Sequence, residues 1–180
     1  MKIIIISEQP TGNICGMEEF QRKLTEGNKA EILSLRYAAE NADDVFREIK
    51  SQDPDLLITV DLPGFEQCTL TDNVAYNLLS CKQFHLLLHE GLPNEQYLAK
   101  PLNISMFFYC VSDACRERLK WQYPDLPYLG ILEGWQSGEG QSAQDGNARA
   151  LYTAYGEFLR ESMLEPFACQ RLACGGADSF

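Results

Sequence analysis

Residues 2–7 read KIIIIS, and four consecutive isoleucines in so short a run are typical of a strand buried on both faces. Comparable apolar runs recur along the chain, and their first residues are separated by 22 to 28 residues. They are AEILSL from Ala30, LLITVD from Leu56, FHLLLH from Phe84, MFFYCVS from Met106 and YLGIL from Tyr128. A parallel strand, its crossover helix and two loops need about 20–30 residues. The spacing therefore predicts a three-layer, doubly wound α/β fold (Rossmann-like) with a mainly parallel six-stranded sheet.

Helical patterns fill the intervals between these runs. Met17, Phe20 and Leu24 lie on one face of a helix, and Asn41 can cap the next one. Further helices are expected over residues 71–80, 95–99, 113–123 and 148–163. The segment 134–147 is rich in Gly, Ser and Gln and predicts a flexible loop, while 168–180 is expected to form a tail. We expect the whole chain, 1–180, to form one domain.

The chain is acidic, with a formal net charge of −11, and its Lys and Arg residues are scattered. Nucleic acids and anionic membranes bind basic faces, so neither is an expected partner. No apolar run approaches the roughly 20 residues of a membrane span, and the run at Lys2 is too short for a secretory signal. We therefore expect a cytoplasmic protein without a membrane span.

The cysteines indicate free thiols. There are seven, an odd number, with wide spacing and no C-x-x-C pair: Cys15, Cys68, Cys81, Cys110, Cys115, Cys169 and Cys174. This usage favours a reducing compartment over a disulfide framework. A tetrahedral metal site needs closely spaced ligand pairs, which are missing here, so we expect neither a metal nor another cofactor. Cys110 lies within an apolar strand and is expected to be a small core residue.

The polar residues that follow the strands are the candidate site. Because the carboxyl ends of parallel strands share one edge, they should gather there. His89 is the candidate catalytic residue, since an imidazole at that edge can act as a base or orient a hydroxyl, although it could also be merely solvated. Glu90 and Asp61 are candidate ligand contacts, but Asp61 could instead only shape the turn before Pro63. Ser112 is a candidate contact or, alternatively, a helix cap.

Two further features bear on the chemistry. His85 lies inside a strand and is expected to be a packed, hydrogen-bonded core residue. The segment Thr11–Gly16 reads TGNICG, which is neither a dinucleotide-binding G-x-G-x-x-G loop nor a Walker loop. No G-x-S-x-G elbow is present, which argues against an α/β-hydrolase.

Taken in order, three segments resemble the N-terminal domain of GT-B glycosyltransferases. KIIIISEQPTGNICGMEEFQRKL resembles the opening strand, glycine loop and helix of that family, and FHLLLHEGLP resembles its fourth strand and the histidine that follows. MFFYCVSDACRERLKWQYPDLPYLGIL resembles a later strand, cap and helix. The resemblance implies that Asn13 and Gly16 approach a sugar nucleotide and that His89 contacts the transferred sugar. Departures are Cys15 in place of a glycine and Glu90 in place of an aspartate.

The second GT-B domain, which holds the nucleotide, has no counterpart in this sequence. The resemblance therefore implies a half-domain that is non-catalytic alone and acts in binding, with a partner protein, or as a homo-oligomer. An alternative is a glycosyltransferase acting on a sugar nucleotide and an unknown acceptor. A second alternative is a receiver-like signalling domain, because Asp61 and Lys100 resemble the phospho-acceptor and lysine segments of receivers. Whether the protein is an enzyme stays open.

Overall fold

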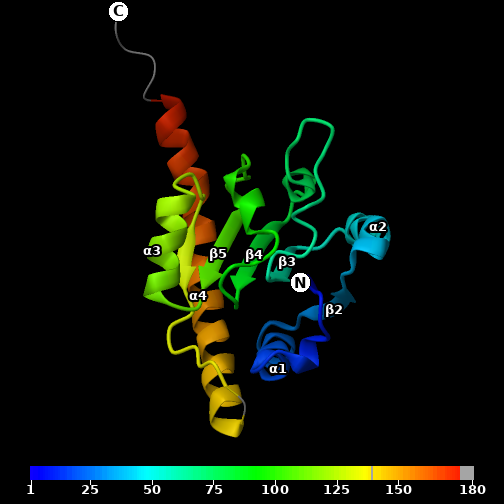
Figure 1. Cartoon of the computed structure of the whole chain (residues 1–180), viewed down its shortest axis with the longest axis vertical. Coiled ribbons are helices and arrows are strands. Elements are labelled where there is room, and N and C mark those ends of the chain that lie inside the picture. Colours follow the sequence, from blue (N-terminus) through cyan, green and yellow to red (C-terminus); the bar gives the residue numbers. More distant parts are fainter. Residues whose placement is uncertain (139, 175–180) are drawn as a thin grey trace, which may run out of the picture.

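The computed structural model describes residues 1–138 and 140–174, and it contains a six-stranded sheet in which every pairing is parallel (Figure 1). The strand order is β2-β1-β3-β4-β5-β6. The strands are β1 (Lys2–Ser7), β2 (Glu31–Arg36), β3 (Leu56–Val60), β4 (Lys82–Leu87), β5 (Met106–Cys110) and β6 (Leu129–Ile131). The predicted fold class is therefore confirmed.

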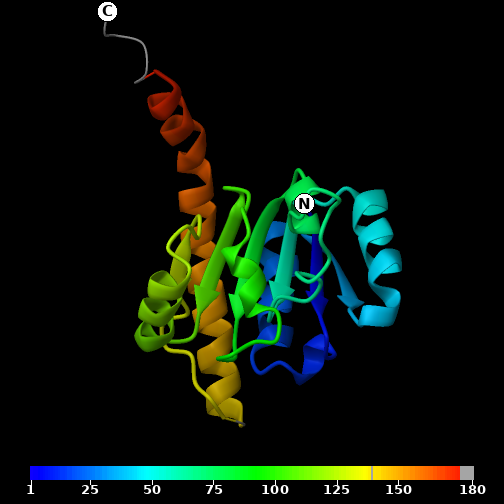
Figure 2. The ribbon, with the colours of Figure 1, turned by 45° about the horizontal axis from the view of Figure 1, so that its top comes forward.

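Helices cover both faces of this sheet (Figure 2). They are α1 (Met17–Asn28), α2 (Ala42–Gln52), α3 (Asp113–Gln122) and α4 (Gln141–Cys174). Helices α1 and α4 pack with Ile3 and Ile5 on one face, whereas α2 and α3 pack with Ile4 and Ile6 on the other. Alternation along one strand thus supplies both cores, which is why the four residues between Lys2 and Ser7 are all isoleucine.

His85 lies in the centre of the sheet, as expected of a core residue. It pairs in register with Thr59, and the Thr59 hydroxyl lies 2.7 Å from His85 Nδ1. The ring stacks on Phe108 with centroids 4.8 Å apart and meets the edge of Phe65. Burial alone lowers the pKa of His85 to about 3, so the imidazole is neutral in the folded protein.

The predicted helix over 71–80 is wrong. Within it the chain forms only a 3-10 turn, η3 (Ala75–Leu78), which follows a loop closed by a bridge between Cys68 and Val74. The hydroxyl of Thr71 lies 2.9 Å from that of Thr69 and accepts a hydrogen bond from Asn73. Short polar side chains that bond locally in this way compete with helix formation.

Helix α4 begins earlier and ends later than the sequence indicates. The predicted loop 134–147 is helical from Gln141 onward, because Asn147 is fully buried and bonds both the N–H and the carbonyl of Gln136. The helix also replaces the first part of the predicted tail, 168–180, as far as Cys174; the remaining residues, 175–180, lie outside the described residues. Figure 1 shows its far end extending beyond the sheet.

Two observations concern the described residues as a whole. The cysteine side chains that the structure describes are all free thiols, as the spacing predicts: Cys15, Cys68, Cys81, Cys110 and Cys115. Within residues 1–138 and 140–174, no helix has both the length and the apolar character that a bilayer crossing requires.

Candidate functional site

The strand order places a topological switch point between β1 and β3. The chain leaves β1 towards β2 on one side, and from β3 onward it builds the sheet on the other side. Ligands of open α/β sheets bind beyond the carboxyl ends of the strands at such a point. A groove of about 470 Å³ lies there. It is lined by the segments 7–9, 60–61 and 89–93, which follow β1, β3 and β4. We refer to it as the rim groove.

Asp61 and His89 form a side-chain pair in the rim groove. Asp61 Oδ2 lies 2.6 Å from His89 Nδ1, while Asp61 Oδ1 accepts hydrogen bonds from the backbone N–H groups of Leu88 and His89. The carboxylate is mostly covered, at 19% exposure, and the imidazole is open, at 65%. A carboxylate that accepts the Nδ1 proton of a histidine leaves Nε2 free as a base or acceptor. The pair can therefore orient a hydroxyl group or accept its proton.

The backbone conformation at the end of β3 directs Asp61 towards His89. Asp61 has φ 63° and Leu62 has φ 58°, and Leu62 is fully buried. Aspartate tolerates this left-handed region, but a bulky apolar residue there is strained. Strain of this kind persists where the surrounding structure enforces it, and it gathers at functional sites. Asp61 thus shapes the turn and also lines the rim groove, where a ligand contact stays a prediction.

A partly buried network of hydrogen bonds supports the loops behind the groove. The Tyr37 hydroxyl donates to Glu66 Oε1, and Asn94 Nδ2 donates to Glu66 Oε2 at 2.7 Å and to the carbonyl of Leu62 at 3.1 Å. Burial, and then the Glu66 carboxylate, raise the pKa of the Tyr37 hydroxyl. Sequence reasoning missed this network, because its members lie in three distant segments and share no local pattern.

The described residues that line the rim groove carry no Lys or Arg side chain. Their polar groups are the side chains of Ser7, Glu8, Gln9, Asp61, His89 and Glu90. Carboxylates, amides and hydroxyls bind neutral, hydroxyl-bearing ligands, whereas phosphates require cations or free backbone N–H groups. The predicted residues Asp61, His89 and Glu90 are thus brought together, and their chemistry favours an uncharged polar ligand.

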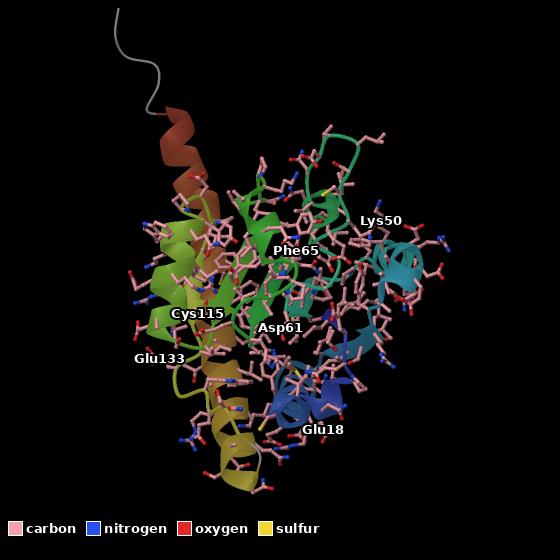
Figure 3. The ribbon with its side chains drawn as sticks, in the orientation of Figure 1. Glu18, Lys50, Asp61, Phe65, Cys115 and Glu133 are labelled. Atoms are coloured by element: carbon pink, nitrogen blue, oxygen red, sulfur yellow. The ribbon has the colours of Figure 1, made fainter. Side chains whose placement is uncertain are left out.

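Asn13 and Gly16 belong to a separate hollow of about 760 Å³. The glycine loop and the first turns of α1 and α4 enclose it, and Glu18, Glu19 and Asp145 make it acidic. A β-carbon on Gly12 would lie only 2.9 Å from Glu18 Oε1, so this carboxylate lies against the glycine loop. Figure 3 shows Glu18 beside α1, away from Asp61, which follows the end of β3.

Gly16 has a packing role that its place in the loop does not reveal. It is buried, has φ 86°, and a β-carbon there would lie 2.5 Å from the backbone nitrogen of Ala148 in α4. Glycine is therefore needed where α1 meets α4. Asn13, in contrast, is exposed and remains available to a ligand of the second hollow.

Ser112 and Lys100 occupy structural positions. The Ser112 hydroxyl accepts a hydrogen bond from the backbone N–H of Cys115 at 3.1 Å, so the interpretation of this residue as a helix cap is confirmed. Lys100 precedes β5 and pairs with Asp72. It therefore lies at the amino-terminal ends of the strands, whereas Asp61 lies at their carboxyl ends. The lysine proposed for a receiver domain is therefore not at the rim.

Removing the Asp61 carboxylate should destabilise the fold as well as free His89. We expect Asp61→Ala to lower the free energy of unfolding by about 2 kcal/mol, because the largely buried Leu88 N–H loses its acceptor. Asp61→Asn keeps an acceptor oxygen and tolerates the positive φ, so it should lose less than half as much. Urea unfolding of the two variants would measure the difference, and equal losses would contradict this role of the carboxylate.

The groups available for metal binding are few. Among the residues that the structure describes, no group of three or more His, Cys, Asp or Glu side chains could hold a metal ion.

No known family model matches this chain, and no curated protein sequence matches it. Its function is therefore inferred from the chemistry of the rim.

Proposed function

We propose that this chain is a GT-B glycosyltransferase-like domain that binds a carbohydrate in the rim groove and does not transfer sugar alone. The observation that carries the proposal is the His89 imidazole, oriented by Asp61 in a groove whose described lining has no cation. Sugars present neutral hydroxyl groups, which pair with carboxylate, amide and imidazole acceptors and donors. The resemblance of residues 2–135 to the N-terminal domain of GT-B glycosyltransferases supports the same ligand class.

The chemistry of the pair suits a sugar hydroxyl. With Nδ1 donating to Asp61, His89 Nε2 can accept the proton of a hydroxyl that becomes a nucleophile. The transfer itself would need an activated sugar held opposite His89. A partner subunit with a donor domain is the natural source, since the resemblance covers only the first half of a GT-B enzyme.

The second hollow does not favour a sugar nucleotide. A nucleoside diphosphate would place negative charge beside Glu18, Glu19 and Asp145. Arg22 also lines this hollow, but its guanidinium pairs with Glu19 at 2.6 Å and with Glu26 at 2.5 Å. Repulsion between like charges disfavours such binding. Independent transfer from a sugar nucleotide is therefore the weaker candidate.

Titration of the isotopically labelled protein with neutral mono- and disaccharides would test the proposal. We expect saccharide-dependent NMR shifts at the backbone amides of His89, Glu90 and Gly91. His89→Ala should weaken binding at least about tenfold, the equivalent of one charge-assisted hydrogen bond. Lys120→Ala is the matched control, because Lys120 lies in the last turn of α3, away from the carboxyl ends of the strands.

Two results would contradict the proposal. One is the absence of shifts at the rim groove with every saccharide of the panel. The other is preferential binding of a nucleoside diphosphate sugar in the second hollow, which would favour an independent glycosyltransferase.

A receiver-like function has one observation in its favour, the position of Asp61 at the end of β3 beside the switch point. Both Asp61 oxygens, however, already accept hydrogen bonds, and Glu8 is the acidic residue that follows β1. Incubation with acetyl phosphate and Mg²⁺ distinguishes the two functions. Phosphorylation of Asp61 would support signalling, and an unmodified chain is the result that the carbohydrate proposal predicts.

A further inference from the structure

A third hollow, of about 800 Å³, lies between α2 and the loop that joins β3 to β4. Its apolar lining consists of the half-buried Phe46 and Ala75 and the exposed Leu70 and Leu78. The Phe46 ring packs on the Tyr76 ring, with centroids 5.0 Å apart, so the core fixes its position. Among the described residues, none lines both this hollow and the rim groove. We refer to it as the α2 groove.

The loop that joins β3 to β4 holds Leu70 in the solvent. The N–H of Thr69 donates to the carbonyl of Asn73 at 2.7 Å, and the N–H of Asp72 donates to the carbonyl of Thr69 at 2.9 Å. The Asp72 carboxylate also pairs with Lys100. Figure 1 shows this loop standing out from the sheet. Leu70 is fully exposed within it, so an ordered loop presents an apolar side chain to water.

The α2 groove has a basic and an acidic end. Arg47 and Lys50 line it, and Arg47 pairs with Asp44 at 2.8 Å. The ion pairs of the described residues do not include Lys50, which Figure 3 labels beside α2. Asp43 also lines the groove, about 10 Å before Lys50 along the helix. A ligand therefore meets an unpaired ammonium group at one end, although the chain as a whole has a net charge of −11.

This combination favours a protein partner over other ligands. Exposed apolar side chains gathered at a hollow are typical of surfaces that contact another protein. Nucleic acids and anionic membranes would be repelled by the acidic chain as a whole. A single ammonium group beside an apolar floor instead complements a peptide that carries both apolar side chains and carboxylates.

We propose that the α2 groove binds an acidic, apolar peptide segment of a partner protein. The apolar side chains of the segment pack between Phe46 and Leu70, and one of its carboxylates pairs with Lys50. Repulsion by Asp43 sets the direction of the segment, with its carboxylate at the Lys50 end. Because the loop that carries Leu70 is already ordered, binding costs little conformational entropy there. This surface is independent of the proposed carbohydrate site.

Titration of the isotopically labelled full chain with a short, blocked peptide of alternating leucine and glutamate would test the proposal. We expect NMR shifts at the backbone amides of the groove and none at His89. The reporting residues are Phe46, Lys50, Leu70 and Leu78. A second peptide, in which lysine replaces every glutamate, should bind the groove at least about tenfold more weakly, because its charges repel Lys50.

Two variants separate the apolar and the charged contribution. Leu70→Ser should weaken binding of the leucine–glutamate peptide by about tenfold, since the packed leucine is lost. Its urea unfolding should stay unchanged, because Leu70 makes no part of the core. Lys50→Glu should weaken binding by at least about fivefold. Lys120→Glu is the matched control, since Lys120 is also exposed and lies in the last turn of its helix, as Lys50 does.

Three results would overturn the proposal. One is the absence of shifts at the α2 groove with the leucine–glutamate peptide. Another is equal affinity of the groove for the lysine-containing peptide, which would leave no role for Lys50. The third is line broadening of the same amides that grows with protein concentration in the absence of peptide, which would show that a second copy of the chain covers the groove.

Discussion

Gly16→Ala should destabilise this fold by about 3 kcal/mol, although it adds only one methyl group. Gly16 has φ 86°, a conformation that costs an L-residue about 1–2 kcal/mol. The new β-carbon would also lie 2.5 Å from the backbone nitrogen of Ala148 and 2.8 Å from the carbonyl carbon of Asn147. These neighbours are backbone atoms of α4, so α1 and α4 would have to separate.

Gly91→Ala provides the control for this experiment. Gly91 also has a positive φ, 65°, but a β-carbon there would meet no atom within 4 Å. Its replacement should cost only the conformational part, about 1–2 kcal/mol. Urea unfolding of both variants separates the two contributions. Equal losses would show that the contact between Gly16 and α4 contributes nothing.

Acid should destabilise the protein strongly through His85. The pKa of this buried imidazole is about 3 in the folded state, whereas an unfolded histidine has its ordinary pKa near 6.5. As the pH falls below about 6.5, the unfolded chain takes up a proton that the folded chain refuses, so folding stability is lost. Between pH 7 and pH 4 the loss amounts to roughly 3 kcal/mol, at 1.36 kcal/mol for each pH unit. Above pH 7 His85 contributes no pH dependence.

The double variant Thr59→Val/His85→Leu isolates this effect. It removes the titrating ring together with its hydrogen-bonding partner, so that no hydroxyl is left buried and unpaired. The free energy of unfolding of both proteins is measured by urea titration at several pH values. We expect the difference between the two curves to change by roughly 3 kcal/mol from pH 7 to pH 4. Parallel curves would show that His85 takes up its proton equally in the folded and unfolded states, which would contradict the prediction.

The strands were predictable because their apolar runs need no context. A run buried on both faces, such as 2–7 or 56–60, can occupy few places other than the middle of a parallel sheet. The start of α4 was not predictable, since the Ser, Gln and Asp residues of 141–147 have a loop-like composition. What makes that segment helical is the burial of Asn147 and Ala148 against the glycine loop, which is a tertiary contact.

The same distinction holds for the candidate site. His89, Glu90 and Asp61 were predictable, because residues that directly follow parallel strands must share one edge. The role of Gly16 could not be seen, since its partner Ala148 lies far along the chain.

The position of α4 has a consequence for how the protein folds during translation. Ile3 and Ile5 leave the ribosome well before Leu151, Ala154 and Phe158, with which they share a core. Until then, one face of the nascent sheet has no cover over β4 and β5, where Phe84 and Phe107 pack against Phe158. Exposed apolar surface of this kind attracts chaperones and promotes aggregation. If the ribosome stalled before α4 was translated, the nascent chain would therefore keep one apolar face of its sheet exposed and prone to aggregation.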